Sequence, residues 1–180
     1  MDSQEWWELI EAARGRVADP ADTEAVAARA AMLLSARPRG EIVLADEVLW
    51  SLMANSYRYP LWAAAYLING GCSDDGFEYF RGWLIMQGRA GYERVMADTD
   101  ALAGFATIRA KAPSRRLVEC EDALYIASRA YLAATGEEFP RSGFRIKYPR
   151  LDRTGWDFDF DDHAEVERRL PRLAALFPDY

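Results

Sequence analysis

The sequence predicts a mainly α-helical fold, a single-domain multi-helix bundle with a small β-hairpin near its end. Apolar residues recur at intervals of three and four along most of the chain, which is typical of amphipathic helices. Capping residues, prolines and glycines separate these segments. Only two late stretches alternate with a period of two. A chain of 180 residues, 51% of them hydrophobic, fits one domain, so we assign residues 1–180 to it, with 143–161 as the hairpin appendage.

The first half of the chain predicts four helices. Asp2 and Glu5 form a capping-box pattern that opens the first one. A second helix is expected after Asp19-Pro20, because proline fits the first helical position. The third covers about 41–56, and Pro60 starts an apolar fourth helix that continues to Ile68.

The stretch from Asn69 to Arg89 is the most informative one. Gly70 or Gly71 is suited to end a helix in the left-handed conformation, and Ser73 is suited to cap the next one. Gly82 lies inside that next helix, where glycine is unfavourable by about 1 kcal/mol relative to alanine. We therefore expect a close helix–helix approach at this position.

The second half predicts one long helix, the hairpin and a final helix. Apolar residues at intervals of three and four extend the long helix over about 115–134, and Gly136 ends it. The two hairpin strands are Phe144–Tyr148 and Trp156–Phe160, whose basic and acidic outer faces would pair across the hairpin. The final helix starts near Asp162, and Pro171 kinks or restarts it.

Polar residues cluster around the helix that Ser73 would cap. They form our candidate ligand-binding set: Asn69, Ser73, Asp74, Asp75, Glu78, Arg81 and Arg89. Asp74 and Glu78 share one helix face, so carboxylates there could hold a cation. The structural alternative is a capped helix start with charge pairs on a solvated face, and this alternative carries more weight.

A second candidate site is a carboxylate metal site formed by Asp74, Glu78, Glu119 and Asp122. It lacks the Glu-x-x-His signature of di-metal helical bundles. The single histidine, His163, follows a run of aspartates, which a charged helix start also explains. The sequence contains no phosphate-binding glycine loop and no nucleophile motif, so it implies no cofactor and does not decide whether the protein is an enzyme.

The net charge of −7 argues against nucleic acid as a partner, because a phosphate backbone repels an acidic surface. No apolar run reaches the length of a membrane span, and the N-terminus does not resemble a signal peptide. Two cysteines are too few for a disulfide scaffold. We therefore expect a cytoplasmic protein without membrane contact, whose partner is a protein or a small molecule, with a homodimer among the options.

LWAAAYLINGG, from Leu61, and QGR with the Tyr-Glu helix after it are the most specific part of a resemblance to a bacterial family known as domain of unknown function 4240. The resemblance covers most of the chain, from Trp6-Trp7-Glu8 to Pro171-Arg172-Leu173, and Ala123-Leu124-Tyr125 and Thr135-Gly136-Glu137 are weaker echoes. The resemblance implies a bacterial cytoplasmic helical domain and supplies no catalytic residue. We thus predict a non-enzymatic interaction or ligand-binding helical module, with a metal-dependent hydrolase acting on phosphoesters or nucleotides as the alternative.

Overall fold

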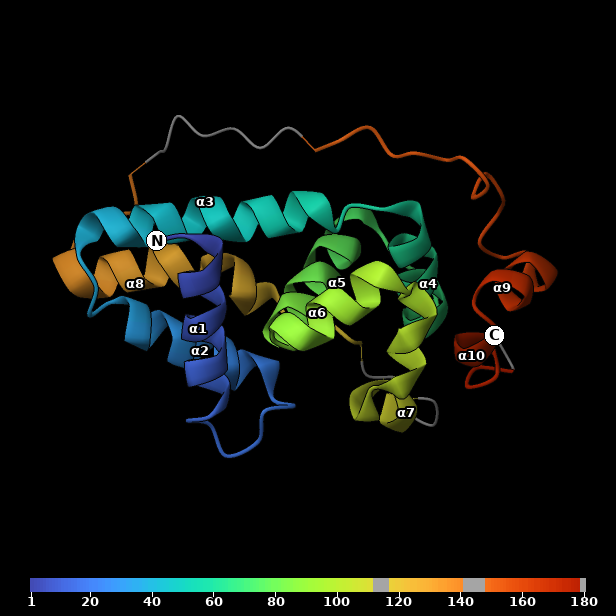
Figure 1. Cartoon of the computed structure of the whole chain (residues 1–180), viewed down its shortest axis with the longest axis horizontal. Helices are drawn as coiled ribbons and strands as arrows, with labels where there is room; N and C mark the ends of the chain where they lie inside the picture. Colours follow the sequence, from blue (N-terminus) through green and yellow to red (C-terminus); the bar gives the residue numbers. More distant parts are fainter. Residues whose placement is uncertain (112–116, 141–147, 179–180) are drawn as a thin grey trace.

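The computed structural model describes residues 1–111, 117–140 and 148–178, and within these ranges every regular element is a helix (Figure 1). The elements in chain order are α1 (Ser3–Arg14), α2 (Thr23–Leu34), α3 (Arg39–Asn55), α4 (Tyr59–Asn69), α5 (Asp74–Met86), α6 (Arg89–Ala97), the 3₁₀ helix η1 (Thr99–Gly104), α7 (Ala106–Lys111), the 3₁₀ helix η2 (Glu121–Tyr125), α8 (Ile126–Thr135), α9 (His163–Arg169) and α10 (Pro171–Ala174).

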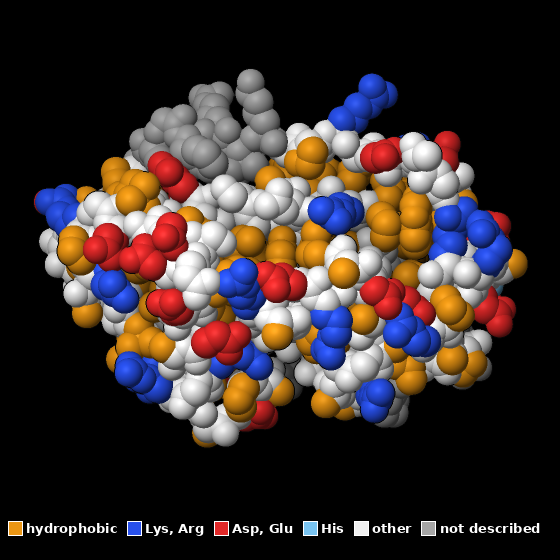
Figure 2. All heavy atoms as spheres, in the orientation of Figure 1, with side chains coloured by type: hydrophobic (Ala, Val, Ile, Leu, Met, Phe, Trp, Pro, Cys, Tyr) orange, Lys and Arg blue, Asp and Glu red, His pale blue; other side chains and the backbone are white. Residues whose placement is uncertain are grey.

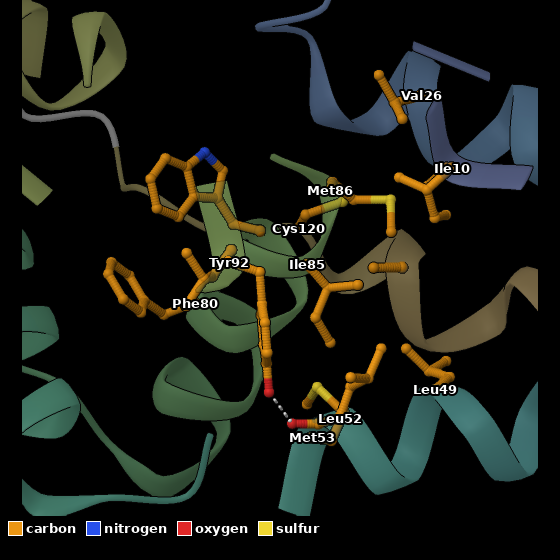
Figure 3. Close-up of a cluster of buried hydrophobic side chains, with 14 of the residues drawn as sticks. Ile10, Val26, Leu49, Leu52, Met53, Phe80, Ile85, Met86, Tyr92 and Cys120 are labelled. Atoms are coloured by element: carbon orange, nitrogen blue, oxygen red, sulfur yellow. Dashed lines mark hydrogen bonds between the residues drawn. The ribbon is translucent and has the colours of Figure 1, made fainter. Parts of the chain in front are cut away.

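The helices form one elongated body (Figure 1). At one end α1 packs on α2, and α8 packs on both α2 and α3. Toward the other end α5 contacts η2, α6 and α4. Apolar side chains from α1, α2, α3 and α5 converge between these groups, including Ile10, Val26, Leu49 and Ile85 (Figure 3). The predicted helical class is therefore correct, and one continuous core joins the two ends.

Local sequence signals fix several helix ends as predicted. Asp2 and Glu5 form the complete capping box of α1. Gly70 ends α4 with φ of 68°, in the left-handed region that glycine adopts without penalty. The Ser73 side chain accepts a hydrogen bond from the Gly76 N–H and caps α5. The second helix begins later than predicted, because Asp22 caps it in place of Asp19.

The long helix predicted over 115–134 is wrong in its first part. Residues 112–116 lie outside the described ranges, and 117–120 are extended before η2 and α8 begin. The Asn69 side chain holds this segment, since its Oδ1 accepts from the Val118 N–H at 2.9 Å and its Nδ2 donates to the Val118 carbonyl at 3.3 Å. The Cys120 N–H also donates to the Tyr79 carbonyl at 3.0 Å. These bonds satisfy the backbone without a helix.

Gly82 allows the extended segment to reach α5, as the expected close approach requires. A Cβ at position 82 would lie 2.5 Å from the Cys120 carbonyl oxygen and 3.3 Å from the Ala123 Cβ. The partner is an extended segment with a 3₁₀ turn, and the sequence had suggested a helix.

We expect Gly82→Ala to lower the free energy of unfolding by about 2 kcal/mol, because overpacking against backbone outweighs the gain in helix propensity. Gly40→Ala in α3 is the matched control: nothing lies within 4 Å of a Cβ there, so the gain in propensity remains. Urea unfolding of both variants measures the difference. A neutral or stabilising Gly82→Ala would contradict the close approach.

The predicted β-hairpin over 143–161 is wrong, because the described part of the chain contains no strand. Phe144, Ile146 and their basic neighbours lie outside the described residues. In the second half, Asp152 Oδ1 accepts from the Thr154 N–H at 2.8 Å, and Asp159 Oδ1 accepts from the Asp161 N–H at 3.1 Å. Such aspartate turns compete with a strand ladder for backbone donors. The alternating aspartates therefore produce turns.

Trp6 and Trp7 are both buried, although adjacent residues on a helix point in different directions. α1 is covered on two sides: it packs against α2 and α3, and Trp7 also contacts Tyr92 of α6 with ring centroids 5.4 Å apart. Neither tryptophan marks an exposed partner surface. No described helix is long and apolar enough to cross a membrane.

Asp46 of α3 makes the stability of the fold depend on pH. Its burial raises the pKa of the carboxyl group to about 6. The carboxyl group has a pKa near 4 in the unfolded chain. Between about pH 4 and pH 6 the folded state therefore binds more protons than the unfolded state, and the free energy of unfolding falls as pH rises through this range. We expect Asp46→Asn to raise the free energy of unfolding by about 1 kcal/mol at pH 7.5, since partial exposure screens the charge. The gain should nearly vanish at pH 4 in urea titrations, and an equal gain at both pH values would contradict it.

Candidate functional site

The C-terminal segment folds back on the helical body. We call residues 148–178 the tail, and we call the surface of α4, α5 and η1 under it the docking face. In Figure 1 the tail runs from near the middle of the molecule to the end opposite α8, where α10 lies against η1 and α4. Val166, Leu170 and Leu173 are its buried apolar anchors, as the periodicity of the final helix predicts.

One end of the docking face is built around Arg81 of α5, whose side chain is 2% exposed. Its Nη1 donates to the Met53 carbonyl at 2.6 Å, and its Nε donates to the Phe77 carbonyl at 3.2 Å. Met53 lies in the last turn of α3, where carbonyls lack helical partners and carry partial negative charge. No carboxylate of a described residue lies within 4.0 Å of this guanidinium.

Aromatic rings enclose the Arg81 guanidinium. The ring centroids of Phe77, Tyr57 and Tyr148 lie 4.8, 5.1 and 5.1 Å from its central carbon. Trp62 stacks on the Phe77 ring, with the ring centroids 4.8 Å apart. Three of these rings belong to the body, and Tyr148 comes from the tail. Cation–π contacts of this kind are strongest where water is excluded.

Tyr148 contacts both charged side chains at this end of the docking face, Glu78 and Arg81. Its hydroxyl donates to Glu78 Oε1 at 2.7 Å, while its ring covers Arg81. Burial and the bond to Glu78 raise the pKa of the phenol, and the Arg81 charge opposes the rise. The tail thus supplies a neutral hydroxyl where Glu78 and Arg81 would otherwise face water.

The middle of the docking face is aromatic. Phe160 of the tail contacts the rings of Tyr59 and Tyr66, both at 5.6 Å between centroids. Tyr66 also donates its hydroxyl to Asp161 Oδ1 at 3.1 Å, and Arg153 stacks on Tyr59 at 5.3 Å. On the face drawn in Figure 2, acidic and basic side chains are interspersed, and hydrophobic side chains reach the surface toward the end where α4 and the tail lie.

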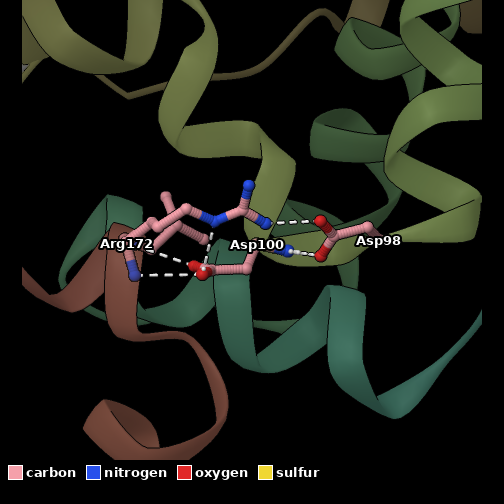
Figure 4. Close-up of polar contacts among 4 residues, drawn as sticks. Asp98, Asp100 and Arg172 are labelled. Atoms are coloured by element: carbon pink, nitrogen blue, oxygen red, sulfur yellow. Dashed lines mark hydrogen bonds and ion pairs between the residues drawn. The ribbon is translucent and has the colours of Figure 1, made fainter.

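The other end is centred on Asp100 of η1, which is 6% exposed (Figure 4). Asp100 accepts from the backbone N–H of Arg172 at 3.0 Å, from Arg172 Nε at 2.9 Å and from the Leu173 N–H at 2.9 Å. The Arg172 Nη2 also contacts Asp98. Asp100 therefore caps the start of α10 and neutralises its arginine.

The structure brings three of the predicted ligand-binding residues to or beside the docking face: Glu78 and Arg81 lie on it, and Ser73 caps the same helix. Asp74 and Asp75 are exposed in the first turn of α5. Asn69 lies away from this face and binds the backbone of Val118.

Arg89 lies elsewhere, at the joint between α5 and α6. Glu11 of α1 accepts from the Arg89 N–H at 3.1 Å, and the Arg89 Nε donates to Glu93 at 2.7 Å. Gly88 precedes it with φ of 83°, and a Cβ there would lie 2.2 Å from Glu11 Oε1. The QGR motif therefore forms the connection between α5 and α6, and Glu11 of α1 binds it there.

The proposed metal ligands have separate partners. Glu78 accepts from Tyr148, and Asp122 pairs with Arg129 at 2.6 Å, while Asp74 and Glu119 are exposed. Among the described residues, no group of three His, Cys, Asp or Glu side chains is placed to hold a metal ion. Burial raises the pKa of both thiols, Cys72 and Cys120, to about 11, so neither is a thiolate near neutral pH.

Two cavities border these elements. A cavity of about 280 Å³ lies at the joint between body and tail, lined by Arg58, Pro60 and Asp98 on one side and by Trp156, Arg169 and Leu170 on the other. A larger one of about 740 Å³ lies between α2, α7 and residues 117–119, with Trp83 in its wall. Neither of these two cavities is lined by Arg81 or Tyr148.

Asp100, Arg172 and Tyr148 are residues of this site that no sequence pattern indicated. Asp98, Thr99 and Asp100 read as a helix cap, and Asp98 does cap η1. An aspartate that caps one helix and pairs with an arginine 72 residues later has no local signature. The sequence signal that overlaps the docking face is the polar cluster around α5, which includes Glu78 and Arg81.

These features define a helical domain whose own C-terminal segment covers a face with buried charges. A family model described as Protein of unknown function (DUF4240) matches residues 1–133. The chain belongs to this family, as the resemblance implied, and the tail lies outside the matched region. No curated protein and no solved structure matches the chain.

Proposed function

We propose that this protein is a non-enzymatic binding module and that the docking face is its binding surface. One observation carries the proposal. Arg81 and Asp100 are the two charged side chains among the described residues that are buried, and both lie on this face under the tail. Charged side chains are rarely buried unless paired, and Arg81 has no carboxylate partner in the described chain. Its position fits a residue kept to recognise a ligand group.

The chemistry of the face indicates a polypeptide ligand. At one end Arg81, Glu78 and three body rings suit an aromatic side chain that carries a hydrogen-bonding group. At the other end Asp98 and Asp100 suit a basic side chain at the start of a helix. Aromatic and arginine anchors of this type dominate the affinity of protein interfaces. We place the module in the cytoplasm, where free thiols such as its two cysteines persist.

The alternative of a metal-dependent hydrolase has less support. Its four carboxylates do not converge on one point in the described residues, and three-ligand groups are absent there. Metal-assisted hydrolysis needs ligands from several elements directed at one ion. Native mass spectrometry before and after addition of a chelator would reveal a bound metal.

Selection of displayed random peptides tests the proposed function without a known ligand. The bait is the full chain with Tyr148→Ala and Arg172→Ala, which uncovers both ends of the face. The counter-bait adds Tyr59→Ala and Asp98→Ala on the face itself. Circular dichroism must show equal helix content for both. We expect enriched peptides that bind the bait and lose at least tenfold in affinity for the counter-bait. No enrichment, or binding that is equal for both baits, would contradict the proposal.

A further inference from the structure

We infer that the tail is a built-in competitor for the docking face, and that the natural partner is a segment with the same chemistry that binds by displacing it. That chemistry is an aromatic residue for Arg81, aromatic rings for Tyr59 and Tyr66, and an arginine in the first turn of a short helix for Asp98 and Asp100. The inference rests on the proposed function, because it names the occupant and the regulation of the same face.

The first support is the way in which the tail is attached. Among the described residues, every backbone–backbone hydrogen bond that the tail makes joins two tail residues. Its bonds to the body all involve a side chain, as in Tyr148 to Glu78, Tyr66 to Asp161 and Arg172 to Asp100. Side-chain anchors on a prepared surface are the usual way in which a separate segment binds, and they can be exchanged without remodelling the body.

The second support is that the tail holds much of its own shape. Asp162 caps α9, Glu165 pairs with Arg168 and Arg169, and Arg169 stacks on Trp156 and Phe158 at 5.1 and 4.9 Å. These contacts lie within the tail, so they do not need the body. The tail can therefore leave the docking face as one cooperative unit.

The third support is the joint itself. The cavity of about 280 Å³ separates Pro60 and Met96 of the body from Trp156 and Leu170 of the tail. This cavity is open to solvent, so water reaches the boundary between the tail and the body. The family match also ends at residue 133, before the tail begins, so the matched domain does not include it.

Covalent connection gives the tail an advantage over any partner. A segment on the same chain meets its site at an effective concentration that a free partner has to match. A partner therefore binds only the fraction of molecules whose face is open, and its apparent dissociation constant rises by the inverse of that fraction. Weakening the two ends of the tail should increase that fraction and tighten binding of an added segment.

The test uses a fluorescent synthetic peptide of residues 148–178 and the full-length protein. Fluorescence anisotropy measures its affinity for the wild-type chain and for the Tyr148→Ala/Arg172→Ala chain, whose own tail is weakened. We expect at least about tenfold tighter binding to the weakened chain. A peptide of the same composition in scrambled order should bind neither, and adding Tyr59→Ala and Asp98→Ala to the face should remove the gain.

Equal affinity for the two chains, or no binding to the weakened chain, would overturn the inference. If the double variant loses helix content, Tyr148→Ala alone replaces it, with a smaller gain of about threefold expected and equal affinity again overturning the inference. Peptide selection separates the two proposals. If selected peptides bind through the docking face but the tail peptide does not bind, the proposed function stands and the inference that the tail competes for this face is wrong. If neither the selected peptides nor the tail peptide bind, both the proposed function and the inference are wrong.

Discussion

The Asp100→Ala chain is expected to lose about 3 kcal/mol of unfolding free energy. Asp100 is buried and accepts three hydrogen bonds, two of them from backbone N–H groups in the first turn of α10. Hydrogen bonds to a charged group each contribute about 1.5–3 kcal/mol, and their loss leaves the buried Leu173 N–H without a partner. Urea unfolding at pH 7.5, followed by circular dichroism, measures the loss.

Asp98→Ala is the matched control, because Asp98 contacts the same Arg172 from a half-exposed position. Exposed ion pairs contribute about 0–1 kcal/mol and the cap that Asp98 gives η1 about 1 kcal/mol, so this variant should lose clearly less than Asp100→Ala, about 1 kcal/mol. Equal losses for the two variants would mean that Asp100 acts only as a charge near Arg172. The cap that it gives α10 would then contribute nothing.

Arg81→Ala is expected to lower the free energy of unfolding by about 3 kcal/mol. The substitution removes a long buried side chain and leaves a cavity between Tyr57, Phe77 and Tyr148. Arg81→Met refills most of this volume with an apolar stem and removes a buried charge that has no carboxylate partner. We therefore expect the methionine variant to lie within about 1 kcal/mol of the wild type.

The comparison between these two variants separates folding from binding. If Arg81→Met is stable but no longer binds the selected peptides, the guanidinium is kept for recognition, at little benefit to stability. If Arg81→Met loses as much stability as Arg81→Ala, the guanidinium itself holds the end of α3 through Met53. The functional interpretation of Arg81 would then lose its basis.

Local chemistry in the sequence predicted the helices and several of their ends. Asp2, Gly70 and Ser73 act as predicted because a cap depends on residues within one turn. The same reasoning failed at 117–120, where apolar spacing of three and four also fits an extended segment followed by a 3₁₀ turn. Asn69 decides between the two, and its partner Val118 is 49 residues away.

The structure of the predicted hairpin region and of the docking face also depends on contacts that local sequence patterns do not encode. The alternation of Trp156, Phe158 and Phe160 does place these rings against the core, but aspartate turns shape the backbone between them. Arg81 was among the predicted binding residues because it belongs to the polar cluster around the helix that Ser73 caps. Its cover by Tyr148 depends on how a distant segment folds back, which no local pattern encodes.

Hydrogen exchange read by mass spectrometry tests most directly whether the tail is a separable cover on the docking face. The wild-type chain is compared with the Tyr148→Ala/Arg172→Ala chain. We predict faster exchange in peptides from residues 148–178 and from α4 and η1, while peptides from α1, α2, α3 and α8 keep their wild-type protection. Acceleration of all helices together, or of none, would contradict a tail that leaves the body intact.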